Sequence, residues 1–198
     1  QSVTENWLRE QWRKTPAPFY SSVDLRNAGF KLAPVDTNLF PAGFNNLNDR
    51  FISLAVQAAQ ETLERLLPGC LRILLIPENH TRNSFYFENL STLQDILEKA
   101  GFEVRIGSLL EEMPHAKEIV LASGARITLE PIVRVADQIK VKDFLPCCIL
   151  LNNDLANGIP EILQGIEQTI LPNMNLGWHS RLKSNHFRHY AQVAGEFA

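Results

Sequence analysis

"CLRILLIPENHTRN", residues 70–83, places an apolar run directly before a run of polar side chains. The apolar part lies between Gly69 and Pro77 and lacks the polar alternation of a half-exposed strand, which is typical of a strand buried on both faces of a sheet. Such strands occur mainly in parallel sheets, whose crossover connections are usually helices. The stretch therefore predicts a central strand of an α/β fold, with residues 78–83 at its carboxyl end.

The rest of the chain alternates between helical and strand patterns. Helices are predicted at residues 4–14, 47–69, 83–100, 159–170 and 179–197, and further strands at 22–25, 102–108 and 147–152. Residues 117–142 alternate in the manner of hairpins. We therefore predict an α/β fold with an open, mostly parallel sheet, helices on both faces and an appended hairpin region. Residues 1–20 are expected to be an amino-terminal helix with a proline-containing linker, and residues 21–198 the α/β substrate-binding domain.

Composition narrows the function classes. The chain has 198 residues and is 45% hydrophobic, so it can bury a core. Its net charge of −3 gives it no overall positive potential that would attract nucleic acid. No apolar run is long enough to span a bilayer, and the first residues show no signal-peptide pattern. Three cysteines, two of them adjacent, make a poor disulfide framework. These features predict a cytoplasmic protein with no membrane or nucleic-acid partner; they are compatible with a homo-oligomer.

Polar clusters follow three predicted strands. They are 26–46, 78–83 and 152–158, and the carboxyl ends of parallel strands are where ligands bind in open α/β sheets. Cationic groups can hold carboxylates or phosphates, so the candidate catalytic residues are Arg26, Arg82 and Lys183. Amides, carboxylates and the remaining polar groups suit an amino-acid zwitterion. The candidate substrate-binding residues are Asn27, Lys31, Asp36, Asn38, Asn45, Asn46, Glu78, Asn79, His80, Asn83, Asn152, Asn153, Asp154, Ser184 and His186.

Several of these residues have a second interpretation. Any single asparagine can serve a turn or cap a helix, and Asn83 or Ser84 can cap the helix that follows. The basic, aromatic segment 178–190 is either a solvated helix face or an anion-binding wall. His186 and His189 of this segment form an HxxH pattern, but the further ligands that a zinc site needs are missing. We therefore predict no metal-binding residues. Cys147 and Cys148 are expected to pack in a buried strand. Neither GxGxxG nor GxxxxGK[ST] is present.

Four long motifs carry a family resemblance. They are "RNAGFKLAPVDTNLFPAGFNNL", "LLIPENHTRN", "ILLNNDLANGIPEILQGIEQ" and "GWHSRLKSNHF". Together they resemble the proteobacterial type of glutamate–cysteine ligase, a family that makes γ-glutamylcysteine in the first step of glutathione biosynthesis. The resemblance extends over nearly the whole chain from about residue 20.

The resemblance implies an ATP-dependent, Mg²⁺-requiring ligase of the ATP-grasp-like group. In such a reaction ATP phosphorylates the side-chain carboxylate of glutamate, and the cysteine amine then attacks the γ-glutamyl phosphate. Members of the family are about twice as long, so the chain is expected to be an amino-terminal portion without the ATP-clamping half, the alternative being a naturally short relative. The alternative is a non-catalytic amino-acid-binding or scaffolding domain of the same fold.

Overall fold

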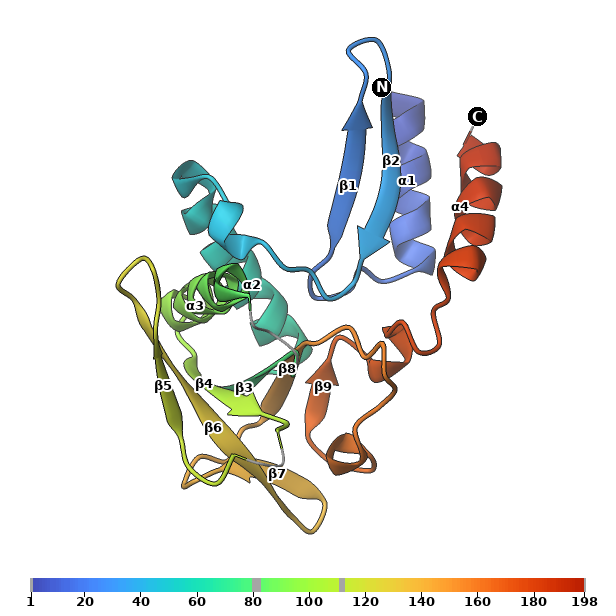
Figure 1. The fold of residues 1–198 in the computed structure, drawn as a ribbon. Coiled ribbons are helices and arrows are strands. Elements are labelled where there is room, and N and C mark those ends of the chain that lie inside the picture. Colours follow the sequence, from blue (N-terminus) through green and yellow to red (C-terminus); the bar gives the residue numbers. More distant parts are fainter. Residues whose placement is uncertain (1, 80–82, 111–112, 198) are drawn as a thin grey trace.

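The structure is a computed structural model that describes residues 2–79, 83–110 and 113–197 (Figure 1). Its helices are α1 (Ser2–Lys14), α2 (Ile52–Leu66), α3 (Ser84–Lys99) and α4 (Lys183–Phe197), with short 3₁₀ helices η1 (Phe44–Asn46), η2 (Asp49–Phe51), η3 (Glu161–Leu163) and η4 (Met174–Leu176). Its strands are β1 (Ser22–Asn27), β2 (Leu32–Asn38), β3 (Arg72–Pro77), β4 (Glu103–Ser108), β5 (Lys117–Val120), β6 (Arg126–Val135), β7 (Gln138–Val141), β8 (Cys148–Asn152) and β9 (Thr169–Leu171).

Within the described residues, seven strands form the main sheet. Its order is β5-β6-β4-β3-β8-β9, and β7 pairs with β6 at one side. The pairs β3–β4, β3–β8, β4–β6 and β8–β9 are parallel, whereas β5 and β7 run antiparallel to β6. The predicted fold class and the appended hairpins at 117–142 are both confirmed, and β3 lies in the middle of the sheet.

The apolar run of β3 is explained by burial on both faces. Ile73 and Leu75 belong to one core cluster, and Leu74 and Ile76 belong to the other. Helices α2 and α3 cover the first face (Figure 1). The second face is covered by β7 and by loops and short 3₁₀ helices around Leu163, which is fully buried. Because successive side chains of a strand point to opposite faces, both sets had to be apolar.

Helix α3 has the ends that the sequence predicts. The side chain of Asn83 accepts a hydrogen bond from the backbone N–H of Phe85 at 3.0 Å, so it caps the helix. At the other end Gly101 has a φ of +98°, a left-handed conformation that ends the helix at low cost only for glycine. The capping interpretation of Asn83 is therefore confirmed.

The predicted helix at 159–170 is wrong. This segment contains the single turn η3, a left-handed Gly165 with a φ of +66°, and strand β9. Its isoleucines recur at helical spacing, but they pack on the sheet from an extended chain. The end of this segment is a strand despite its helical spacing, because β9 pairs in parallel with β8 at the sheet edge. This pairing provides hydrogen bonds for the backbone of a β-branched segment.

The predicted strand at 22–25 exists but does not join the main sheet. Strand β1 pairs antiparallel with β2 in a separate two-stranded sheet, and the turn between them contains Gly29 with a φ of +84°. This hairpin stands beside α1 and α4, away from the main sheet (Figure 1). Trp7 of α1 and Phe197 of α4 are in edge-to-face contact, with ring centroids 5.0 Å apart. Local alternation and a glycine turn thus make a hairpin where the sequence predicted a parallel strand.

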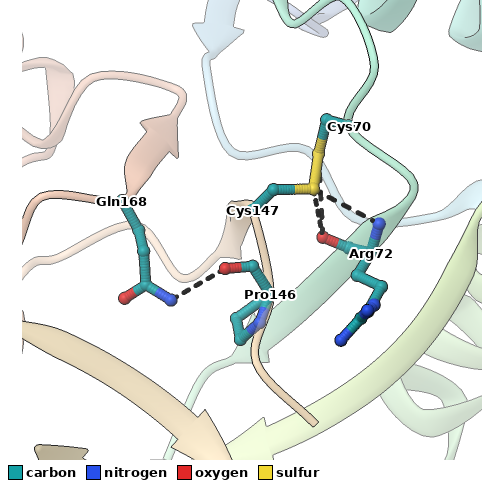
Figure 2. Close-up of a disulfide and its surroundings, with 5 residues drawn as sticks. All are labelled: Cys70, Arg72, Pro146, Cys147 and Gln168. Carbon is teal, nitrogen blue, oxygen red and sulfur yellow. Dashed lines mark hydrogen bonds between the residues drawn. A yellow bond between two sulfur atoms is a disulfide. The ribbon is translucent and has the colours of Figure 1, made fainter.

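The expectation that the cysteines make a poor disulfide framework is wrong for Cys70 and Cys147. Cys70 and Cys147 form a disulfide that joins the chain just before β3 to the chain just before β8 (Figure 2). Cys147 is exposed rather than packed in the core, because it precedes the buried strand. Cys148 is fully buried as expected, and burial raises the pKa of its thiol to about 12. No helix in the described part of the chain is long and apolar enough to cross a membrane.

Candidate functional site

A polar pocket lies at the carboxyl ends of β3 and β8. Its volume is about 250 Å³, and it is lined by Glu78, Asn79, Asn153, Asp154, Leu155, Ala156, Asn157, Gly158 and Pro160. The first two residues follow β3 directly, and the others follow β8. Pro77 and Asn152 are paired in the parallel register, so the two loops leave the sheet side by side. We call this cavity the strand-end pocket.

The loop after β8 is held by its own side chains. Asn153 Oδ1 accepts a hydrogen bond from the N–H of Leu155, and Asp154 Oδ1 accepts one from the N–H of Ala156, each at 2.9 Å. These are Asx turns, which replace missing backbone hydrogen bonds in a sharp loop. The second carboxylate oxygen of Asp154 takes no part in that turn and can accept a ligand donor.

A buried hydrogen-bond network supports the pocket from behind. Asn152, only 2% exposed, donates from Nδ2 to the carbonyl of Pro41 at 2.7 Å, and its Oδ1 accepts from Asn89 Nδ2 at 3.2 Å. Asn89 Oδ1 in turn accepts from the N–H groups of Gly43 and Phe44. Two asparagines therefore tie the segment before η1 to the end of β8, and Asn152 has a structural task rather than an exposed contact surface.

Tyr86 links the two strand ends. Its hydroxyl donates to the carbonyl of Asn152 at 2.7 Å and accepts from the N–H of Glu78 at 3.0 Å. Burial raises the pKa of Tyr86, and the charges of Glu78 and Asp154 raise it further. Burial likewise raises the pKa of Tyr20, whose hydroxyl donates to the carbonyl of Leu151. Both phenols therefore stay protonated donors.

A second cavity adjoins the strand-end pocket. It has a volume of about 400 Å³, lies at the carboxyl end of β4 beside the middle of β6, and shares Asn79 and Pro160 with the first. Its wall is mainly apolar and includes Leu109, Leu110 and Met113. The carboxyl edge of the sheet thus offers a polar compartment and an apolar compartment side by side.

A third cavity lies at the start of α4. Its volume is about 410 Å³, and it is lined by Asn175, Ser180, Arg181, Asn185, His186 and His189. Arg181 stacks on the ring of Trp178, with its guanidinium carbon 4.4 Å from the ring centroid. The Nε of Arg181 is buried without a hydrogen-bond partner among the described residues. Of the three candidate residues in segment 178–190, only His186 lines this basic pocket, and the anion-binding interpretation of the segment stays a prediction.

Charged groups hold α4 against the hairpin. Lys183 Nζ donates to Asp36 Oδ2 at 2.9 Å, and Thr37 Oγ1 lies 2.9 Å from His186 Nε2. The hydrogen bond from Lys183 lowers the pKa of Asp36, whereas burial lowers the pKa of His186 and of Arg181. Lys183, predicted as catalytic, therefore occupies an ion pair in this structure.

Gly177 lies where the chain that leads to the basic pocket passes close to the loop after β8. A Cβ atom at this position would come within 2.7 Å of Leu155 Cβ and 3.1 Å of the Asp154 carbonyl oxygen. The next residue, Trp178, donates its N–H to that same carbonyl at 2.9 Å. The lack of a side chain at Gly177 lets the chain pass directly over the loop after β8.

The structure separates the sequence-predicted residues into groups. It brings Glu78, Asn79, Asn153 and Asp154 together in the strand-end pocket. It places Asp36, Lys183, Ser184 and His186 where β2 meets α4. The expectation that all three polar clusters share one sheet edge is wrong for Arg26, Asn27 and Lys31, which are exposed residues in or beside the β1–β2 turn.

Other predicted residues have local tasks. Asn38 Oδ1 accepts from the N–H of Phe40 at 2.9 Å, Asn45 and Asn46 are exposed in η1, and Asn83 caps α3. His80 and Arg82 lie outside the described residues, so their roles stay predictions.

Sequence reasoning missed several residues that line these cavities. Asn157 and Gly158 were visible as the end of a polar cluster, and Arg181 and His189 lay within the basic segment. The role of Asn89 had no sequence signal, because it lies on the buried face of a helix.

The described residues contain no group of three or more His, Cys, Asp and Glu side chains that could hold a metal ion. Glu78 and Asp154 both line the strand-end pocket, where their carboxylates can pair with a cationic group.

Comparisons with known proteins place this geometry in a family. A family model described as glutamate-cysteine ligase matches residues 1–198. A solved protein from Methylobacillus flagellatus KT, provisionally assigned as a gamma-glutamylcysteine synthetase, is 55% identical with a TM-score of 0.91. The match covers 98% of this chain and 46% of that protein, so the chain spans less than half of its solved relative. No curated protein matches the chain.

Proposed function

The chain belongs to the glutamate–cysteine ligase family, and on that premise we propose that it binds the amino-acid substrates for ATP-dependent formation of γ-glutamylcysteine. The observation that carries the proposal is the strand-end pocket, in which two carboxylates and three amides converge from the loops after two adjacent parallel strands. Ligand sites at this edge are the rule for open α/β sheets.

Glutamate is the substrate we assign to the strand-end pocket. Glu78 and Asp154 would bind its ammonium group, and the side-chain amides of Asn79 and Asn153 would donate to its carboxylates. The network through Asn152 and Tyr86 supports this assignment, because it fixes both loops before a ligand arrives. A pre-ordered site loses less conformational entropy on binding.

Cysteine is the substrate we assign to the adjoining cavity. Its small, weakly polar side chain suits the wall of Leu109, Leu110 and Met113. The shared residue Asn79 would place the cysteine amine next to the compartment that holds glutamate. This arrangement allows the amine to attack an activated side-chain carboxylate of glutamate, with the carboxylate oxygen leaving as phosphate.

ATP and Mg²⁺ are part of the proposal. Phosphate groups would be held by Arg181, His186 and His189 of the basic pocket, and Mg²⁺ would be bound mainly through those phosphates. When bound, the ion neutralises phosphate charge. Amino-acid ligation for glutathione synthesis is a cytoplasmic task, so we propose that location as well.

Calorimetric titration of the folded chain with L-glutamate tests the proposal. Asp154→Asn keeps the oxygen that accepts from Ala156 but removes the charge. Loss of a charge-assisted contact should weaken glutamate binding by about 1.5–3 kcal/mol, roughly tenfold to 150-fold in Kd.

Asp95→Asn is the matched control. Asp95 forms an exposed ion pair with Lys99 on α3, so its substitution should leave the affinity unchanged. Absence of glutamate binding to a folded wild-type chain, or equal affinity in the wild type and Asp154→Asn, would contradict the assignment of this pocket.

A further inference from the structure

The largest cavity described lies at the opposite end of β3 and β8 and has no task in the proposed ligation. Its volume is about 540 Å³, and its lining includes Arg72, Cys147, Glu167 and Gln168. Cys147, which is disulfide-bonded to Cys70 (Figure 2), therefore forms part of the wall of this cavity. From this we propose that Cys147 is a thiol-exchange site for small zwitterionic thiols and disulfides of the amino-acid type.

The two sulfurs differ in access. Cys147 is exposed and lines the cavity, whereas Cys70 is half-buried and is not part of the lining. Attack by a thiolate needs an open approach to one sulfur, with the other as leaving group. The incoming thiolate therefore attacks Cys147 Sγ, the bond between the two sulfurs breaks, and Cys70 leaves as a thiolate that takes up a proton.

The reaction balances with the small thiol as the only co-reactant. The first attack gives a mixed disulfide on Cys147. A second small thiolate then attacks the sulfur of the bound small molecule, which releases Cys147 as a thiolate. In sum, two small thiols are oxidised to one small disulfide, and the protein disulfide is reduced to two thiols.

The backbone can accommodate both redox states. The carbonyl oxygen of Arg72 lies 3.7 Å from Cys70 Sγ and 3.2 Å from Cys147 Sγ, so an acceptor is close to both sulfurs when they move apart as thiols on reduction. The N–H of Arg72 already donates to Cys147 Sγ at 3.3 Å (Figure 2). A nearby donor stabilises the thiolate form of Cys147, which is the form that exchanges.

The lining charges set the class of ligand. Arg72 supplies a cation, Glu167 supplies an anion, and both are exposed residues of the lining. One charge of each sign matches the carboxylate and the ammonium group of an amino acid. Because Gln168 is tied to Ile139 and Pro146 by hydrogen bonds, it holds the wall and is left unchanged in the test.

Two variants, each of which keeps one cysteine of the disulfide pair, test the site. Folded Cys70→Ser and Cys147→Ser chains are incubated with cystine, and the mixed disulfides are located by peptide mass spectrometry. We expect cysteinylation of Cys147 in Cys70→Ser to be at least about tenfold faster than that of Cys70 in Cys147→Ser. The buried Cys148 should stay unmodified in both. Equal rates at the two positions, or modification only as fast as global unfolding, would overturn the inference.

The charge preference is measured with probes of different charge. Rates for cystine and for the neutral hydroxyethyl disulfide are each divided by the rate on the denatured chain, which removes intrinsic reactivity. We expect the folded Cys70→Ser chain to prefer cystine by at least about fivefold and to lose that preference with Arg72→Gln and Glu167→Gln added. Equal normalised rates before those changes would overturn the binding role of the cavity.

Discussion

The two ends of the β3–β8 pair are held in different ways. At the amino end a covalent bond joins Cys70 to Cys147 beside a large cavity. At the carboxyl end buried hydrogen bonds through Asn152 and Tyr86 hold the loops that line the strand-end pocket. The disulfide fixes two points, whereas the network orients many groups. An end that must present several polar side chains to a ligand needs the second kind of support.

Removing the disulfide should have the largest effect on stability. The two cysteines are 77 residues apart, and closing a loop of that size is worth about 4 kcal/mol in the chain-entropy description. Urea unfolding of the wild type should therefore show a large loss of stability on adding reductant. The Cys70→Ser, Cys147→Ser double variant is the control, since its unfolding should not respond to reductant. A wild type equally stable in both conditions would mean that the amino end does not depend on the bond.

The carboxyl end is tested by Asn152→Ala. This change leaves the Pro41 carbonyl and the Asn89 amide without their buried partner, so we expect a loss of about 2–3 kcal/mol in the free energy of unfolding. Asn45→Ala is the control, because Asn45 is exposed and its loss should cost less than about 0.5 kcal/mol. Similar costs for both changes would remove the distinction between a buried network and ordinary loop polarity.

The junction beyond the carboxyl end is tested by Gly177→Ala. The new Cβ would contact Leu155 and the Asp154 carbonyl too closely, which should cost about 1–3 kcal/mol. Gly195→Ala provides the contrast: Gly195 lies in α4 with nothing within 4 Å, so alanine should stabilise the helix by about 0.5–1 kcal/mol. Thermal unfolding of both variants measures the signs, and a neutral Gly177→Ala would show that the loop yields easily.

The smallest effect is expected away from both strand ends, where α4 meets β2. The folded-state pKa of His186 is lowered by burial, so the unfolded chain takes up the proton first, and stability falls as pH drops below the usual histidine range. The pKa of Asp36 is also lowered, and its contribution is lost at still lower pH, as the carboxylate is protonated.

Thermal unfolding from pH 7 to pH 3 checks both steps. In Asp36→Asn, the loss of stability below the usual aspartate range should vanish. The loss of stability that comes from His186 should remain. The exposed Lys183–Asp36 pair is worth less than about 1 kcal/mol, so the change is small. Greater stability at pH 5 than at pH 7 would contradict the sign.

The sequence predicted the features that depend on neighbouring residues. The unbroken apolar run before Glu78 identified a central strand, and the polar residues that follow two such strands identified the strand-end pocket. Asn83 and Gly101 marked the ends of α3, because caps are read from single residues. These inferences need only chain periodicity and the rule that ligands bind at the carboxyl edge of parallel strands.

Features that depend on long-range pairing could not be predicted. The segment 159–170 has isoleucines at helical spacing, and only the pairing of β9 with β8 makes its end a strand. The partner of Cys70 lies 77 residues away, so no local pattern reveals it. Arg26 lies within β1 rather than after it, and because β1 pairs with β2 the residue lies beside a hairpin turn.

The central claim is that amino-acid ligands bind at the carboxyl end of β3 and β8. The most direct test is an NMR titration of the ¹⁵N-labelled chain with L-glutamate and then with L-cysteine. The chemical shifts of the backbone amides are measured at each addition. The account predicts that the largest shifts fall on Glu78, Asn79 and residues 153–158, with Ser108 and Leu110 responding to cysteine. Shifts confined to residues 26–31 of the hairpin, or no saturable shifts in the folded chain, would contradict it.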